Sequence, residues 1–144
     1  MKKILIPVDS EKPCEKTMDM AKEMAQKYSS EIIILHVNHH FEPMSHPYAE
    51  ISKERSPEAY DAFMEMSNKL VTSAASLFDG TGINVKSEVV NGDAASVICD
   101  YAEEKDCDMI VMCSHGHGAM RRFLLGGITS KVVHHAKVPV MIVR

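Results

Sequence analysis

The residues best suited to bind an anion lie between positions 113 and 129. Positions 113–118 read CSHGHG and follow an apolar run, and Gly126 and Gly127 come just before Ile128 and Thr129, where a helical pattern begins. Glycine lets backbone N–H groups approach a ligand closely, and a helix N-terminus favours negative charge. The pattern therefore predicts a phosphate site, although a glycine-rich turn can also serve only to end a strand and start a helix.

Other familiar chemistries lack their motifs. There is no G-x-x-x-x-G-K-[ST] and no G-x-G-x-x-G after the first apolar run, which argues against a P-loop nucleotidase and a dinucleotide oxidoreductase. His39, His40 and His46 could bind a transition metal, but solvated loop residues are the favoured interpretation. The four cysteines form no C-x-x-C pair, so we expect buried thiols and neither a zinc site nor a disulfide framework: Cys14, Cys99, Cys107 and Cys113.

Five short apolar runs predict the strands that would position these residues. They are continuous or rich in β-branched residues, as in strands covered on both faces of a parallel sheet. The third run alternates apolar and polar residues, which favours a place nearer a sheet edge. The five runs span residues 4–8, 31–37, 84–90, 108–113 and 138–143.

Helical periods lie between these runs. Ser56 and Pro57 give a capping hydroxyl and a first-turn proline for the second helix, which Gly80 stops, and Asp93 can cap the third. Apolar residues at three- and four-residue steps predict helices over about 14–28, 57–77, 94–102 and 128–136. This βαβαβαβαβ order calls for an α/β fold, a doubly wound parallel sheet with right-handed crossovers. Residues 39–55 are the one stretch without periodicity.

Several segments together resemble the universal stress protein family. They are ILIPVD at 4–9, ILHV at 34–37, the Asn91-Gly92-Asp93 turn, and the block MCSHGHGAMRRFLLGGITSKVVHHAKVPVMIVR at 112–144. The resemblance covers essentially the whole chain and implies one domain, 1–144, with a Rossmann-like five-stranded parallel sheet of strand order 3-2-1-4-5, like the adenine nucleotide alpha hydrolases.

The ATP-binding branch of that family carries the motif G-x2-G-x9-G-[ST]. Its four marked positions fall here on Cys113, Gly116, Gly126 and Gly127, so the first and last depart from the pattern. If the ribose packs tightly at Cys113, the larger side chain costs about 1–3 kcal/mol. Gly127 lacks a hydroxyl whose hydrogen bond to a charged group is worth about 1.5–3 kcal/mol. Arg121 and Arg122, in the intervening loop, could offset part of that loss, although such pairs are more often solvated.

The resemblance implies ATP as the ligand, alone or with Mg²⁺ or Mn²⁺. It implies that Pro7 and Asp9 lie beside the ribose and that the Val37 backbone reads the adenine edge. The residue type alone favours Asp9 as a cap of the turn after the strand. Strand ends and resemblance together give this candidate binding set: Pro7, Val8, Asp9, Val37, Met112, Cys113, Gly116, His117, Gly126, Gly127, Ile128 and Thr129.

Three functions remain open. The first is a nucleotide-binding module of the stress response, the second a nucleotide-free interaction protein of the same fold, and the third a slow ATPase or phosphotransferase, which ranks last because no convincing base is present. The chain has 144 residues with a net charge of -4, which disfavours nucleic acid as a partner. No apolar run is long enough to cross a bilayer, and we expect a cytoplasmic protein.

The last strand also predicts a homodimer. It runs from Val138 to Val143, is apolar, and has only Arg144 beyond it. Pro139 donates no ladder hydrogen bond and therefore suits an edge strand. An edge of this kind exposes backbone groups that a second copy can cover, and the family resemblance likewise implies dimers built around this strand.

Overall fold

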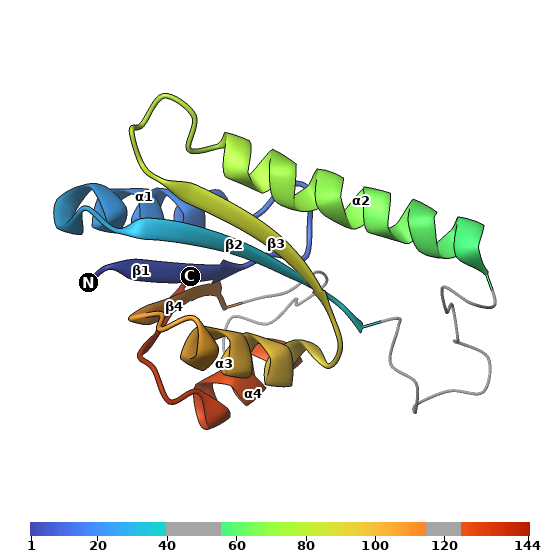
Figure 1. The fold of residues 1–144 in the computed structure, drawn as a ribbon. Helices are drawn as coiled ribbons and strands as arrows, with labels where there is room; N and C mark the ends of the chain where they lie inside the picture. The colour runs from blue at the N-terminus through green and yellow to red at the C-terminus, as the bar shows by residue number, and fades with distance from the viewer. Residues whose placement is uncertain (40–55, 115–124) are drawn as a thin grey trace.

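Strands and helices alternate along the chain in the order that the sequence predicts (Figure 1). The computed structural model describes residues 1–39, 56–114 and 125–144. Its elements are β1 (Lys3–Pro7), α1 (Glu15–Tyr28), β2 (Glu31–Asn38), α2 (Pro57–Ser76), β3 (Val85–Asn91), α3 (Ala94–Glu104), β4 (Met109–Cys113), α4 (Gly127–His135) and β5 (Val140–Val143).

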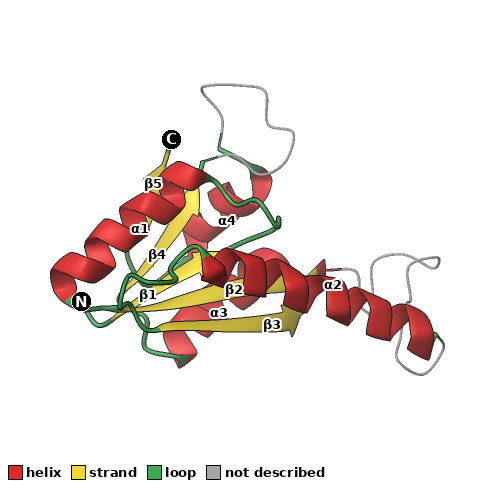
Figure 2. Cartoon of the chain, turned by 90° about the horizontal axis from the view of Figure 1, so that it is seen from above, coloured by secondary structure: helices red, strands yellow, loops and turns green. Residues whose placement is uncertain are grey.

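The five strands form one parallel sheet in the order β3-β2-β1-β4-β5, which confirms the predicted fold (Figure 2). The central strand β1 pairs with β2 through Leu5 and Ile33, and with β4 through Leu5 and Ile110. β3 and β5 are the two edge strands. The alternating pattern of β3 therefore marked an edge correctly, since one of its sides has no strand neighbour.

Each face of the sheet is covered by two helices, and each face has its own core (Figure 1). Because successive strand residues point to opposite faces, Ile4 and Ile6 pack with α1 and α2, whereas Leu5 packs with α3 and α4. The core beneath α1 and α2 includes Met18, Ala21, Ala25, Val71 and Ala74. The core beneath α3 and α4 includes Ile98, Tyr101, Ala102 and Val132.

Of the two helix caps predicted from the sequence, one is confirmed and one is not. The Asp93 carboxylate accepts a hydrogen bond of 3.0 Å from the Ser96 N–H, which confirms it as the cap of α3. Gly92, just before it, has a φ of +146°, and a Cβ there would lie 2.9 Å from Val97 Cγ2, so this turn requires glycine. α2 begins at Pro57 as predicted, but Ser56 makes no side-chain capping bond and that prediction was wrong.

The last strand is shorter than the sequence suggested. It begins at Val140 and not at Val138, because Pro139 has no N–H to donate to a ladder. The Pro139 carbonyl still accepts a hydrogen bond of 2.9 Å from the Ile110 N–H. Two methionines on helices differ in burial, since Met18 is 2% exposed whereas Met66 is 66% exposed.

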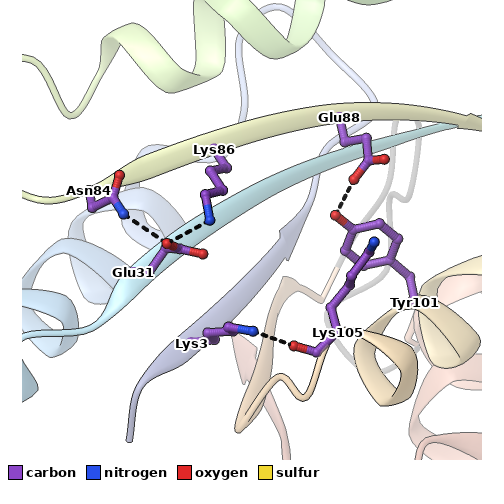
Figure 3. A network of polar contacts seen from close by, with 7 residues as sticks. All are labelled: Lys3, Glu31, Asn84, Lys86, Glu88, Tyr101 and Lys105. Carbon is purple, nitrogen blue, oxygen red and sulfur yellow. Dashed lines mark hydrogen bonds and ion pairs between the residues drawn. The ribbon is translucent and has the colours of Figure 1, made fainter.

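Several polar contacts join neighbouring elements at positions away from the strand ends where ligands bind in this fold class (Figure 3). The Glu31 carboxylate accepts a bond of 2.7 Å from Asn84 Nδ2 and pairs with Lys86 Nζ at 3.0 Å. The Tyr101 hydroxyl donates to Glu88. Burial, and then the bond to Glu88, raise the pKa of Tyr101 well above its ordinary value.

In the described ranges, no helix is long and apolar enough to cross a membrane.

Candidate functional site

A cavity of about 890 Å³ opens at the carboxyl ends of β1, β2 and β4, beside the start of α4 and one face of α2. In the order β3-β2-β1-β4-β5, the chain turns to opposite sides of the sheet between β1 and β4. Ligands of open α/β sheets bind outside the strand ends at this switch point. The cavity therefore lies where the topology places a binding site.

Ten of the twelve candidate binding residues line this one cavity. They come from three strand ends and from the first turn of α4. Gly116 and His117, the other two candidates, lie outside the described residues, as do His40, His46, Arg121 and Arg122. The ten are Pro7, Val8, Asp9, Val37, Met112, Cys113, Gly126, Gly127, Ile128 and Thr129.

The start of α4 gives the cavity its positive end. Gly126 is the N-cap and, as a glycine, has no side chain that could cap the helix. The Gly126 N–H is bound to the Ser114 carbonyl at 3.0 Å, and the Thr129 hydroxyl donates to the Cys113 carbonyl at 3.2 Å. These two bonds hold the helix start against the end of β4. Among residues 1–39, 56–114 and 125–144, no carbonyl accepts a hydrogen bond from the Gly127 or Ile128 N–H, so these two groups can bind another acceptor.

Gly127 has room for a side chain. A Cβ at this position would meet no atom of the described residues within 4 Å, and Gly127 is exposed. Glycine is therefore not required here by crowding. The departure from the family motif at this position removes a hydroxyl from the site and leaves the backbone of α4 in place.

Asp9 follows β1 at the mouth of the cavity and is exposed. The alternative interpretation was that its carboxylate caps the following turn. In that turn, the Lys12 N–H donates a bond of 3.1 Å to the Ser10 hydroxyl, so Ser10 supplies the cap. The Asp9 carboxylate remains at the cavity, where a ligand hydroxyl can reach it.

A polar cluster on the cavity wall was not found from the sequence. His36 Nδ1 lies 2.8 Å from the Val8 carbonyl, and its Nε2 lies 3.0 Å from Asn38 Oδ1. The Ser67 hydroxyl lies 2.7 Å from the same Asn38 oxygen and 2.9 Å from the Phe63 carbonyl. Asn38 and Ser67 are each 4% exposed. The cluster thereby joins the ends of β1 and β2 to α2 at the cavity wall.

The apolar wall comes largely from α2. Phe63, Met66, Ser67 and Leu70 all line the cavity, and their spacing places them on one helical face. Phe63, Met66 and Leu70 belong to the stripe of apolar residues at three- and four-residue steps that predicts this helix. The same stripe passes from the core onto the cavity because α2 extends beyond the end of the sheet, as Figure 2 shows. Helical periodicity thus identified the face, but it could not say what that face covers.

The cavity offers few charged ligands for a metal. Within residues 1–39, 56–114 and 125–144, no group of three or more His, Cys, Asp or Glu side chains could hold a metal ion. Asp9 and Glu11 are the two carboxylates that line the cavity. One or two carboxylates suffice for Mg²⁺ when phosphate oxygens supply further ligands. The residues therefore fit a divalent cation held mainly through a phosphorylated ligand.

Parallel strands in this order, with a cavity at the switch point and an uncapped helix start beside it, define a doubly wound α/β protein with a ligand site at its strand ends. The chain belongs to the universal stress protein family, whose family model matches residues 1–144. Among curated relatives, it is 26% identical to universal stress protein MJ0531 of Methanocaldococcus jannaschii over 144 residues, which cover 99% of this chain and 82% of the relative.

Solved structures show the same fold. The structure of protein MJ0577, which is a universal stress protein of Methanocaldococcus jannaschii, matches with a TM-score of 0.80 and 30% identity, covering 99% of this chain and 94% of the other. The universal stress protein of Archaeoglobus fulgidus in complex with dAMP matches with a TM-score of 0.68 and 20% identity, covering 100% and 98%. The similarity to the second structure concerns the fold.

Proposed function

We propose that this protein is a nucleotide-binding module of the stress response that takes an adenine nucleotide, with ATP as the expected ligand. The observation that carries the proposal is the single cavity that joins ten candidate residues to the uncapped start of α4. Membership of the universal stress protein family and the dAMP complex of a protein with the same fold support it.

The two ends of the cavity suit the two ends of a nucleotide. Leu35, Val37 and Met112 give an apolar wall for a base, and the backbone of Val37 at the end of β2 can read its polar edge. At the other end, N–H groups of α4 suit phosphate oxygens. Asp9 lies between them at the mouth and suits ribose hydroxyls. Mg²⁺ or Mn²⁺ would be held mainly by the phosphates, with Asp9 or Glu11 as an additional ligand.

Calorimetric titration with ATP, AMP and GMP tests the proposal. Binding of the adenine nucleotides with weaker binding of GMP is expected. The chain has no Trp, so bound nucleotide is also visible as excess absorbance near 260 nm after purification. No binding of any of the three nucleotides would refute the proposal and favour the nucleotide-free interaction protein.

A matched pair of variants locates the phosphates. Ile128 lines the cavity in the first turn of α4 and is 44% exposed, so substitutions there do not disturb the core. Ile128→Glu should weaken ATP at least about tenfold, because like charges near a protein surface repel by roughly 1–4 kcal/mol. Ile128→Gln introduces a side chain of the same shape as glutamate without its charge, and this variant should bind ATP within about threefold of wild type. Equal affinities of the two variants would place the phosphates elsewhere.

We further propose that two copies pair through β5. The strand is at the edge of the sheet, and its four apolar residues are only half-buried. A second copy would cover the unpaired backbone groups. Light scattering with size exclusion should give a dimer for wild type and a monomer for Ile142→Lys. Val133→Lys, on the exposed face of α4, is the charge-matched control and should remain dimeric. A monomeric wild type at micromolar concentration would contradict this proposal.

A further inference from the structure

Two thiols meet beside the cavity, at the start of α1 and the end of β4. Cys14 is the N-cap residue of α1, and Cys113 is the last residue of β4 and lines the cavity. The Cys113 thiol hydrogen-bonds the Cys14 sulfur, and both residues are half-buried. They are 99 positions apart in sequence, so the fold and not local spacing brings them together. A search for C-x-x-C pairs could not find them.

The groups around Cys14 are arranged for a negatively charged sulfur. As a thiol, Cys14 makes no capping bond, and Thr17 Oγ1 has no hydrogen-bond partner in the part of the chain that the structure describes, although Thr17 is 4% exposed. A thiolate at Cys14 would accept from that hydroxyl and from the first-turn N–H groups of Lys16 and Thr17. An unsatisfied buried hydroxyl is costly, so ionisation of Cys14 removes a penalty.

The pKa of Cys14 differs in direction from the pKa of two other thiols, Cys99 and Cys107. Burial acts to raise the pKa of Cys14, but donors of Thr17, Cys113 and Lys16 that can bond its thiolate outweigh burial and lower the pKa below its ordinary value. Burial raises the pKa of Cys99 and of Cys107. A thiolate is the reactive form of cysteine. Of these three thiols, Cys14 is therefore the best placed to react.

We propose that Cys14 and Cys113 form a peroxide-reactive pair that closes to a reversible disulfide at the wall of the cavity. The Cys14 thiolate attacks the O–O bond of a hydroperoxide, which gives Cys14–SOH and releases hydroxide or alkoxide. The Cys113 sulfur then attacks the Cys14 sulfur, so that an S–S bond forms, the S–O bond breaks and water leaves. The two thiols are oxidised by two electrons, and the peroxide is reduced. A dithiol restores both thiols.

Peptide mapping of the wild-type chain tests the pair directly. Reduced protein is treated with a small excess of hydrogen peroxide, alkylated, and digested without reductant. The expected product is one peptide pair linked through Cys14 and Cys113 within a single chain, which dithiothreitol separates. Linkage between chains, linkage through Cys99 or Cys107, or oxidation of Cys14 to a sulfinic acid without linkage would each overturn the proposal.

Three variants separate the roles of the residues. In Cys113→Ser, the sulfenic acid at Cys14 should accumulate and be trapped by dimedone, whereas Cys99→Ser should form the linked peptide as wild type does. Thr17→Val keeps the shape of Thr17 and removes its hydroxyl, so alkylation of Cys14 by iodoacetamide at pH 7 should slow severalfold. In wild type, Cys14 should be alkylated roughly tenfold faster than Cys99. Equal alkylation rates, or no dimedone adduct in folded Cys113→Ser, would refute the assigned order.

Discussion

Serine at position 127 should tighten nucleotide binding, and alanine at the same position should not. Gly127 is the first helical residue of α4 and lines the cavity beside the N–H groups assigned to phosphate. A Cβ there meets no atom of the described residues within 4 Å, so both side chains enter open space without moving the backbone. The two variants differ only in the hydroxyl.

The magnitude follows from that one group. A hydrogen bond to a charged oxygen is worth about 1.5–3 kcal/mol. Since about 1.4 kcal/mol is tenfold in affinity, Gly127→Ser should lower the Kd for ATP roughly ten- to a hundredfold. Both variants lose the backbone freedom of glycine and gain about 0.4–1 kcal/mol in the free energy of unfolding. This shared gain stabilises the chain with and without ligand and leaves the Kd unchanged.

Calorimetric titration of ATP into wild type, Gly127→Ala and Gly127→Ser measures the difference, and urea denaturation measures the shared gain. If alanine tightened binding as much as serine, the cause would be the helix and not the hydroxyl. If serine left the Kd unchanged while ATP still bound, the phosphates would not lie at the start of α4. Either result would refute the placement of the phosphates at this helix.

Asn38→Ala should cost about 1–3 kcal/mol in the free energy of unfolding, because it removes the hydrogen bonds of both His36 and Ser67 to Asn38 Oδ1; urea denaturation measures this. Asp93→Ala should cost about 1 kcal/mol near pH 7 through loss of the α3 cap. Because the hydrogen bonds from the Ser96 side chain and backbone lower the pKa of Asp93, this difference should be present above about pH 4 and disappear as the pH falls through the lowered pKa, as acid denaturation can show. Folding raises the pKa of Tyr101, so its contribution to the free energy of unfolding is present below about pH 10 and falls at higher pH, where the unfolded tyrosine ionises. In thermal unfolding, the stability of Tyr101→Phe should therefore decline less at alkaline pH than that of wild type.

The fold was predictable because its signals are local and redundant. Runs such as the one around Ile33 are apolar without interruption, which only a strand covered on both faces tolerates, and each is followed by a helical period. The capping role of Asp93 follows from residue type and position. Ser56 fails because a cap depends on the backbone conformation before the helix, and the residue type does not specify that conformation.

The candidate site was predictable only where it lies on strand ends and on the motif. Pro7, Val37 and Cys113 follow from topology, since parallel strands end at the same edge. The cluster of His36, Asn38 and Ser67 joins two strands to a helix that begins after a long connection, and no spacing rule relates them. The pair of Cys14 and Cys113 could not be predicted for the same reason, since no spacing rule relates these two residues.

Cys113 is the residue that the proposed nucleotide site and the proposed thiol pair share. It occupies a position where the ATP-binding branch has glycine, it lines the cavity, and its thiol contacts Cys14. Replacing it by glycine would enlarge the ribose side of the cavity and remove one thiol of the pair. Titration of Cys113→Gly under reducing conditions isolates the first effect, because no disulfide forms in either protein. Tighter ATP binding there would show that Cys113 obstructs the nucleotide, and unchanged binding would show that the cavity accommodates the thiol beside the ribose.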